Sequence, residues 1–379
     1  MIVARFHAAV DEIPSATWNA LRADDNPFLD HAFLSGLERH GCVRRDYGWR
    51  PHHLGIYRDA CLIAAAPLYL KTNSHGEFVF DWSWAHAYAQ HGLNYYPKLL
   101  CAVPYSPVCG PRLLTGAATD ADTLRGIAID AIRDETRRLG LSSAHLNFAT
   151  ETDAAAFAGR DWLMRFDWQF HWHNAGWTTF DEFLAALNHK KRKNIRGERA
   201  RVARAGVCCE IRHGDELDAT HWRALHAFYR STFDDKGNHP ALTLDFFHHL
   251  GAAMPRNVVA VLCRRGSALL AGALMLRSST TLYGRYWGYH EHVEGLHFEA
   301  CYYQGIEYCL RERLAMFEPG AQGEHKLARG FLPTRTRSFH WIADPRFRAA
   351  IANALRHEAR ALDAYRDHLL MHSPYAERT

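Results

Sequence analysis

Fifteen residues near the C-terminus read Phe317-Glu318-Pro319-Gly320-Ala321-Gln322-Gly323-Glu324-His325-Lys326-Leu327-Ala328-Arg329-Gly330-Phe331. Three glycines and a proline make this loop turn-forming rather than helical. It nevertheless holds five charged or titratable side chains within twelve residues: Glu318, Glu324, His325, Lys326 and Arg329. This mixture predicts either a pocket that positions and polarises a polar substrate, or a solvated surface loop.

The segments before this loop are predicted to be a strand over 281–288 and a helix over 297–314. His297 and Glu299 lie at the start of that helix, and both are candidates for acid–base chemistry. An acid in the first turn of a helix is also stabilised by the helix dipole, so Glu299 has a structural explanation as well. Tyr286, in the predicted strand, is a candidate for substrate binding.

The composition is that of an ordinary globular protein with room for two domains. The chain has 379 residues, of which 48% are hydrophobic and 23% are charged. A net charge of +4 is too small to indicate nucleic-acid binding by itself. The nine cysteines include no Cys-x-x-Cys pair, so we expect reduced thiols in a cytoplasmic protein. No stretch approaches the ~18–20 apolar residues of a membrane span, and the N-terminus lacks a signal-peptide pattern.

A strand–turn–strand pattern occurs twice in the chain. Hairpins are predicted over 53–71 and 258–276, and their apolar positions coincide at an offset of 206 residues. A strand and two helices are predicted before each of them. The sequence therefore predicts two copies of one domain, each strand–helix–helix–hairpin, over residues 1–165 and 166–379.

The segment 78–114 is rich in Trp, Tyr, Pro and Gly. Pro104, Pro107 and Pro111 fall within eight residues, which excludes a central strand or the interior of a helix at that point. Long irregular segments inside compact domains are often functional or contact a partner. We therefore expect this segment to be either a functional surface or packing between domains.

A strongly basic helical segment is predicted over 180–204. The capping box Thr179-Phe180-Asp181-Glu182 opens it, and it is either one long helix or two shorter ones divided near Asn188-His189. Eight basic residues and one acid lie between Lys190 and Arg204. This face is either solvated or binds phosphate, because arginine forks match phosphate oxygens. The candidates for phosphate binding are Lys190, Lys191, Arg192 and Arg196.

Other common catalytic and metal-binding patterns are missing from the sequence. The pairs His171-x-His173 and His290-x-His292 could each place two imidazoles on one strand face, but no further ligand has a telling spacing. The chain has no His-Glu-x-x-His, no nucleophile elbow and no Walker-type loop. We therefore predict no metal site.

Three segments of the chain resemble a known family. They are 79–114, the basic run 190–202, and 296–341, which begins with Leu296-His297-Phe298-Glu299-Ala300-Cys301-Tyr302-Tyr303. With the tandem order, they are similar to the FemAB-like family, relatives of the Fem peptidoglycan aminoacyltransferases, in the branch labelled peptidoglycan biosynthesis/recognition. The Fem coiled-coil insertion has no counterpart between Lys190 and Val202. The resemblance implies an α/β (α+β) fold of tandem GNAT-like domains, each a mixed sheet flanked by helices. It also implies transfer of an amino acid from aminoacyl-tRNA to a peptide amine of a peptidoglycan precursor.

The resemblance also implies roles for individual residues. In Fem enzymes a lysine in a glycine-rich stretch serves the transfer, and Lys326 is the matching position, where it would stabilise an oxyanion or the leaving oxygen. Glu318 or Glu299 would take the proton of the attacking amine, and His297 is the alternative base. The residues expected to hold phosphate or carboxylate groups of the acceptor are Arg112, Arg329 and Arg335.

Two acyl donors are compatible with this chemistry. Coenzyme A-dependent GNATs hold pyrophosphate at a helix N-terminus through a Gln/Arg-x-x-Gly-x-Gly/Ala motif. Here the corresponding stretch, His292-Val293-Glu294-Gly295-Leu296-His297-Phe298-Glu299, has one glycine and two acids that would repel phosphate. We therefore expect aminoacyl-tRNA as donor and no bound cofactor, with acetyl-CoA as the alternative. The competing class is a non-catalytic protein that recognises peptidoglycan or RNA, in which Lys326 and an acid would not converge.

Overall fold

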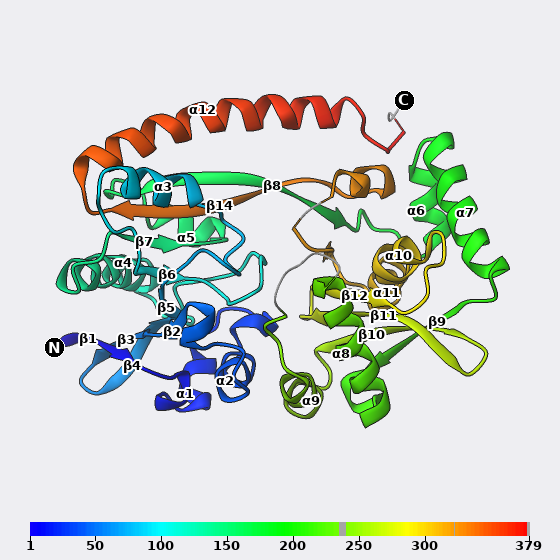
Figure 1. Cartoon of the computed structure of the whole chain (residues 1–379), viewed down its shortest axis with the longest axis horizontal. Helices are drawn as coiled ribbons and strands as arrows, with labels where there is room; N and C mark the ends of the chain where they lie inside the picture. The colour runs from blue at the N-terminus through cyan, green and yellow to red at the C-terminus, as the bar shows by residue number, and fades with distance from the viewer. Residues whose placement is uncertain (235–239, 322, 377–379) are drawn as a thin grey trace. The chain divides into compact units, whose positions relative to one another are not determined.

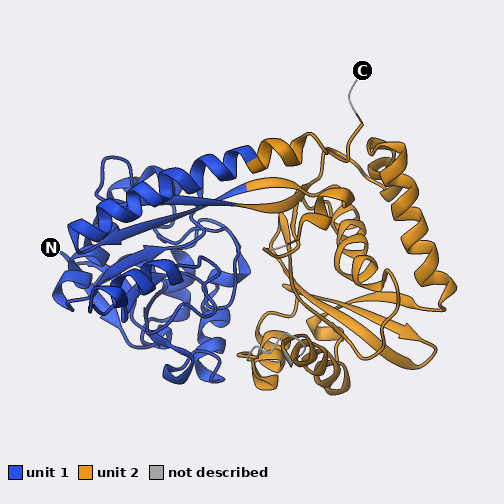
Figure 2. Ribbon diagram, turned by 45° about the horizontal axis from the view of Figure 1, so that its top comes forward, with its two compact units in different colours: residues 1–167, 335–364 blue, residues 168–334, 365–379 orange. Residues whose placement is uncertain are grey.

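The computed structural model divides into two compact units, shown in different colours in Figure 2. It describes residues 1–234, 240–321 and 323–376. Unit 1 comprises Met1–Asp167 with Arg335–Ala364, and unit 2 comprises Trp168–Thr334 with Tyr365–Thr379. The domains predicted from the sequence, 1–165 and 166–379, differ from these units at residues 335–364. These residues join unit 1 because their strand pairs with a strand of that unit, Phe339 opposite Leu146.

Unit 1 contains a three-stranded sheet, a larger set of strands and the helices that cover them (Figure 1). The three-stranded sheet has the order β1-β3-β4, with β1 (Ile2–His7), β3 (His53–Arg58) and β4 (Cys61–Ala66). The larger set has the order β2-β5-β6-β7-β14, with β2 (Trp49–Pro51), β5 (Leu68–Lys71), β6 (Lys98–Cys101), β7 (Ser143–Leu146) and β14 (Leu332–Ile342). The helices are α1 (Ser15–Ala20), α2 (His31–Arg39), α3 (Trp82–Gln90), α4 (Ala121–Arg138), α5 (Glu151–Ala155) and most of α12 (Pro345–Leu370).

Unit 2 is built on strands in the order β8-β13-β12-β11-β10-β9. They are β8 (Leu163–His173), β13 (Met316–Glu318), β12 (Thr281–Tyr289), β11 (Ala268–Arg277), β10 (Val258–Arg265) and β9 (Cys208–His213), and β8 begins in unit 1. The helices are α6 (Phe180–Ala186), α7 (His189–Arg204), α8 (Ala219–Asp234), α9 (Leu244–Ala253), α10 (Leu296–Phe298) and α11 (Gln304–Glu312). A π-helical turn, Glu299–Tyr303, joins α10 to α11.

Each unit repeats one arrangement of strands and helices. In unit 1 the parallel strands β6 and β7 are joined by α4, and in unit 2 the parallel strands β12 and β13 are joined by α10 and α11. An antiparallel hairpin precedes each pair, β3–β4 and β10–β11, and each hairpin has a register shift near its turn. A parallel pair needs such a crossover, which makes the strand–helix–strand unit the common element of the two halves.

Several local predictions are confirmed and one is corrected. The side chain of Asn188 accepts a hydrogen bond from Lys191 N and caps α7. The basic segment therefore forms two shorter helices, α6 and α7, rather than one long helix. The hairpins predicted over 53–71 and 258–276 are present as β3–β4, continued by β5, and as β10–β11. The segment 78–114 is not irregular throughout, because it contains α3 and β6. Pro104, Pro107 and Pro111 all lie after β6, where they do not interrupt the ladder with β5.

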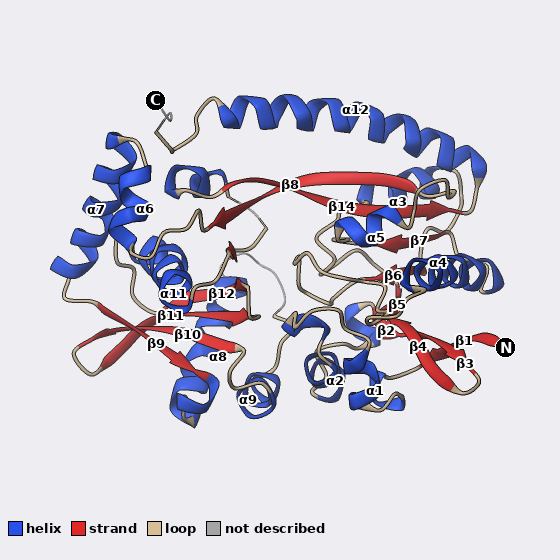
Figure 3. Cartoon of the chain, turned by 180° about the vertical axis from the view of Figure 1, so that it is seen from behind, coloured by secondary structure: helices blue, strands red, loops and turns tan. Residues whose placement is uncertain are grey.

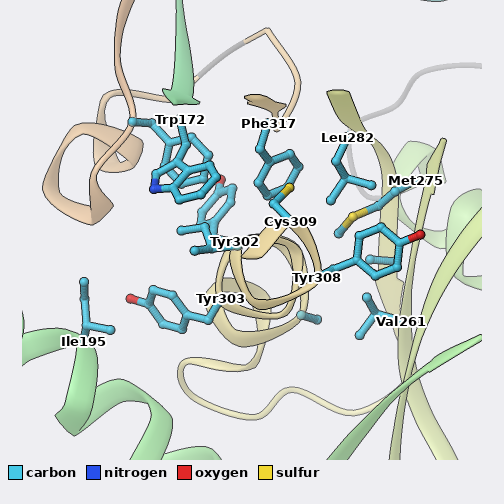
Figure 4. Packing of buried hydrophobic residues seen from close by; sticks show 14 of the residues in the cluster. Trp172, Ile195, Val261, Met275, Leu282, Tyr302, Tyr303, Tyr308, Cys309 and Phe317 are labelled. Carbon is cyan, nitrogen blue, oxygen red and sulfur yellow. The ribbon is translucent and has the colours of Figure 1, made fainter. Parts of the chain in front are cut away.

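The core of unit 2 lies between the sheet and the helical crossover. Figure 4 shows Trp172, Tyr302 and Phe317 packed around the π-helical turn and α11. Ile195 and Val202 of α7 are buried in the same core. On the opposite face of the sheet, α8 and α9 pack against β11 and β12 (Figure 3). The crossover is thus fixed against the sheet and sets the position of the loop that follows β13.

Candidate functional site

The loop after β13 leaves the sheet abruptly. Strand β13 pairs with β12 only from Met316 to Glu318, opposite Thr281–Tyr283, whereas β12 continues to Tyr289. A Cβ on Gly284 would lie 3.1 Å from the Cα of Pro319, so glycine allows the two backbones to approach. Glu318, at the end of β13, is 3% exposed. The divergence of β12 and β13 therefore places a buried carboxyl at the start of the loop.

The loop then forms a short helix, contrary to the expectation of turns throughout. Residues Glu324–Arg329 adopt a 3₁₀ helix that begins after Gly323 and ends at Gly330, both with positive φ, at 117° and 94°. These glycines supply the backbone conformations that the two ends require, and the six residues between them are free to close 3₁₀ turns. The helix turns Lys326 inward, and Leu327 and Arg329 are buried with it.

Lys326 is a buried amine. The residue is 2% exposed, and its Nζ donates a hydrogen bond to the carbonyl oxygen of Gly320 at 2.6 Å. Burial lowers the pKa of Lys326 to about 8, and the nearby Cys301 thiol acts in the opposite direction. An ammonium has three N–H donors, so Lys326 has capacity to contact a developing negative charge in addition to Gly320.

His325, the neighbour of Lys326 in the chain, lies among aromatic rings and close to His297. The Nε2 atom of His325 is hydrogen-bonded to the hydroxyl of Tyr302 at 2.8 Å, and the rings of His325 and His297 are 6.0 Å apart. Desolvation, followed by the charges of Arg329 and Lys326, lowers the pKa of His325. A neutral imidazole can accept a proton, so His325 and His297 are both positioned as bases. The sequence analysis assigned no role to His325, although its place beside Lys326 was visible there.

Glu299 faces helix α7. Its carboxylate accepts hydrogen bonds from Arg199 at 3.1 Å and from Gln304 at 2.8 Å, and the residue is 6% exposed. Arg199 also donates to Glu307 at 2.7 Å. Both carboxylate oxygens of Glu299 thus already accept hydrogen bonds, and a substrate amine would have to displace Arg199 to reach them. The structure therefore explains the burial of Glu299 through its contact with α7.

Arg329 is engaged inside the unit. Its guanidinium donates to both carboxylate oxygens of Glu198, at 2.6 and 3.2 Å, and to the backbone oxygen of His325 at 2.8 Å. The hydroxyl of Tyr303 donates to the same carboxylate. The Arg329 group also lies 3.4 Å from the ring centroid of Phe298. These contacts fasten the 3₁₀ helix to α7, so the residue expected to hold an acceptor group supports the loop instead.

The basic residues of α7 gather at its positive end. Lys190, Lys191 and Arg192 lie in the first turn, where the helix dipole disfavours cations. Lys190 and Arg196 are exposed, and Arg196 is 3.4 Å from Asp181. At the same helix start, Asn188 Oδ1 already accepts a hydrogen bond from Lys191 N, and Asn188 N donates to the carbonyl oxygen of Pro374. The arrangement is unfavourable by itself and favourable once an anion such as phosphate is present.

The other predicted binding residues have structural contacts. Arg112 is completely buried and donates to the carbonyl oxygens of Val108, Gly110 and Asn147 at 2.5–3.0 Å, which leaves it inaccessible to a ligand. Arg335 pairs with Asp363 at 3.0 Å. Both lie in unit 1, whereas Lys326 lies in unit 2.

Tyr286 contributes to packing on the far face of the sheet. Its ring packs 4.9 Å from Tyr229 of α8 and 6.3 Å from Phe247 of α9. On β12 successive side chains alternate between faces, and Trp287 is the residue that reaches His297, at 5.6 Å. Tyr286 therefore lies on the face of β12 that α8 and α9 cover, whereas Trp287 lies on the face toward His297.

Within 1–234, 240–321 and 323–376, no group of three or more His, Cys, Asp or Glu side chains is arranged to hold a metal ion. In the same residues, no helix combines the length and apolar character that crossing a bilayer requires.

Comparison with protein families places the chain in one of them. The sequence model of the FemAB-like family, described as peptidoglycan biosynthesis/recognition, matches residues 9–377. The chain belongs to the FemAB-like family. This confirms the resemblance inferred from the sequence over nearly its whole length. No curated protein matches the sequence.

The solved structures of several other proteins have a similar fold. FemX is 10% identical, with a TM-score of 0.53 over 92% of this chain and 100% of its own. The C-terminal domain of a putative lysylphosphatidylglycerol synthetase from Agrobacterium fabrum is 10% identical, with a TM-score of 0.55 over 91% of this chain and 96% of its own. L-PGS from Bacillus licheniformis is 9% identical, with a TM-score of 0.50 over 88% of this chain and 98% of its own.

These comparisons confirm the predicted fold class of tandem GNAT-like domains, each a mixed sheet flanked by helices. Membership of the FemAB-like family supports a role in peptidoglycan biosynthesis or recognition. The roles of single residues rest on the geometry described above.

Proposed function

We propose that this protein transfers an amino acid from aminoacyl-tRNA to an amine of a peptidoglycan precursor or a similar acceptor, in the cytoplasm, without a bound cofactor. The observation that carries the proposal is Lys326, a buried amine on the 3₁₀ helix that follows β13. It is next in the chain to His325, whose ring lies 6.0 Å from that of His297. Family membership supports the class of acceptor.

The reaction needs one oxyanion donor and one base. The acceptor amine attacks the ester carbonyl of the aminoacyl-tRNA and forms a tetrahedral oxyanion, which the ammonium of Lys326 stabilises. The amine proton passes to a base, and the ester oxygen of the tRNA leaves as a hydroxyl after it receives a proton. His297 and Glu318 are the candidate bases, and His325 joins them because of its position. Glu299 is retained as a weaker candidate because Arg199 occupies its carboxylate.

Helix α7 supports the choice of donor. Its first turns carry Lys190, Lys191, Arg192 and Arg196 at the positive end of the helix dipole, which suits a nucleic-acid phosphate backbone. The ion pairs of Arg199 with Glu299 and of Glu198 with Arg329 fix α7 to the residues around Lys326. By contrast, Glu294 is exposed at the start of α10, where the pyrophosphate of coenzyme A would have to lie.

The test compares donors directly. The purified protein is titrated with aminoacyl-tRNA, coenzyme A and acetyl-CoA at several salt concentrations. We expect tRNA binding that weakens steeply with salt, because phosphate contacts release counterions. We expect no binding of coenzyme A or of acetyl-CoA. Tight acetyl-CoA binding would instead indicate an N-acetyltransferase. Aminoacyl transfer to a peptidoglycan precursor should be lost in Lys326→Ala; wild-type transfer rates in that variant, or binding without any transfer by the wild type, would contradict the proposal.

A further inference from the structure

Unit 1 exposes a group of aromatic side chains that its core does not use. Phe78, Phe80 and Trp82 are 37%, 39% and 54% exposed, within five residues at the start of α3. The rings of Phe80 and Trp82 are stacked, with centroids 4.5 Å apart and planes inclined by 26°. Trp84, two residues further along α3, is buried in the core instead. Clustered exposed aromatic residues of this kind mark a binding surface.

This aromatic platform, Phe78–Phe80–Trp82, is held in place from strand β8. Arg165 donates a hydrogen bond to the carbonyl oxygen of Phe80 at 2.7 Å and binds both carboxylate oxygens of Glu358 on α12, at 2.6–3.2 Å. Phe78 adopts φ of 61°, a conformation that a bulky side chain rarely takes. Backbone in such a conformation persists only where surrounding contacts impose it. The platform is therefore a fixed surface, and binding would not have to order it.

An apolar groove continues from the same arginine. It has a volume of about 320 Å³ and lies between β8 and α12. Its apolar lining comes from Met164, Phe166 and Leu355 among others, and Arg165 and Glu358 lie in its wall. Met164 is 48% exposed there. Unit 1 thus brings together the stacked rings of Phe80 and Trp82, the Arg165–Glu358 pair and the apolar groove.

We propose that this surface binds an N-acetylhexosamine residue of a glycan. The C–H face of a pyranose ring carries partial positive charge and matches the negative face of an indole, so the sugar would stack on Trp82. The fixed Arg165–Glu358 pair offers N–H donors and carboxylate acceptors to the ring hydroxyls. The methyl of the acetamido group fits the apolar groove.

Charge favours a sugar over a membrane surface. Arg165 and Glu358 neutralise each other, and Arg356, on the groove wall, is hydrogen-bonded to Asn353 at 3.1 Å. Anionic lipid headgroups attract clusters of uncompensated Lys and Arg, which these groove residues do not form. This site lies in unit 1, apart from the residues proposed for acyl transfer in unit 2, so the inference goes beyond the proposed function.

The experiment is calorimetric titration of the whole protein with tri-N-acetylchitotriose and with the GlcNAc–MurNAc disaccharide, which separates a chitin-type source from a peptidoglycan source. Cellotriose, which lacks acetamido groups, is the control sugar. We expect binding of at least one acetamido sugar and not of cellotriose. Trp82→Ala should weaken it by about tenfold or more, and Trp82→Phe by less than about threefold. Leu93→Ala, which removes another exposed apolar side chain of the same unit, should leave it unchanged.

The contrary outcomes are equally definite. Absence of sugar binding by the wild type, equal loss in Leu93→Ala, or equal binding of cellotriose overturns the proposal. Binding to phosphatidylglycerol vesicles that Trp82→Ala abolishes, without sugar binding, also overturns it and indicates a membrane surface. Phe80→Ala provides a second variant if Trp82→Ala does not fold. Lys326→Ala should bind the sugar as the wild type does, so failure of the acyl-transfer proposal leaves this test intact.

Discussion

Replacing Lys326 by methionine should stabilise the protein at neutral pH while it abolishes transfer. Lys326 is 2% exposed, and burial lowers its pKa from 10.5 to about 8. A shift of about 2.5 units corresponds to ~3 kcal/mol that folding must supply to bury the protonated amine. Methionine removes this cost but also loses the hydrogen bond to Gly320 O, which is worth ~1 kcal/mol. Methionine, of similar length and uncharged, should therefore raise the free energy of unfolding by about 2 kcal/mol at pH 7.

The gain should depend on pH in a defined direction. Because the folded pKa of Lys326 lies below that of the unfolded chain, the unfolded state binds more protons between pH 8 and 10.5. The wild type should therefore become more stable relative to Lys326→Met as the pH rises through this range. Above it, the amine is neutral in both states, and the variant should be the less stable protein by about the value of the lost hydrogen bond.

Urea denaturation between pH 7 and 10.5, followed by circular dichroism, measures this difference. Lys193→Met is the matched control, because Lys193 is an exposed lysine on α7 and has no burial to relieve. Its stability relative to wild type should stay constant across the range. A Lys326→Met variant that is less stable than wild type at pH 7, or whose difference does not change with pH, would refute the buried-amine argument.

Three further changes test other contacts. Arg329→Met leaves the carboxylate of Glu198 buried without its partner and should lower the free energy of unfolding by ~3 kcal/mol in urea titrations; a loss below ~1 kcal/mol would contradict the anchoring role. Lys190→Ala should reduce the slope of log affinity against log salt for tRNA by about one, and an unchanged slope would exclude a phosphate contact. Gly288→Ala places a Cβ against the carbonyl oxygen of Phe228 and should prevent soluble expression; a normal melting curve would show that α8 can shift.

Local sequence signals predicted much of the fold. Three features depend on short-range geometry, which residue propensities and the spacing of apolar residues describe well. They are the capping box at Thr179, the glycine-bounded loop around Lys326 and the two hairpins. Residues 335–364 could not be assigned in this way. Their place in unit 1 depends on pairing between Phe339 and Leu146, a contact between residues far apart in sequence, which no local pattern encodes.

The candidate site was predicted in part for a similar reason. The loop that holds Lys326 was visible because it combines turn residues with charge. Arg112 was chosen by residue type, but its guanidinium satisfies backbone carbonyls inside unit 1, and burial is not readable from a single arginine. No role was predicted for His325, because its position as a candidate base depends on the nearby ring of His297. The 3₁₀ helix brings these two rings together. The face that Tyr286 occupies depends on the register shift that β12 makes against β11 between Leu274 and Met275, which alternation alone does not predict.

The chain passes between the two units three times, at residues 167–168, 334–335 and 364–365. During synthesis, unit 1 therefore cannot acquire β14 and the first part of α12 until all the strands of unit 2 have been made. Its sheet must wait for a strand about 190 residues downstream of β7, which raises the entropy of closing that contact and slows folding. The two halves of the protein should consequently mature together at the ribosome, and a fragment that ends near residue 165 should expose the unpaired edge of β7 and aggregate.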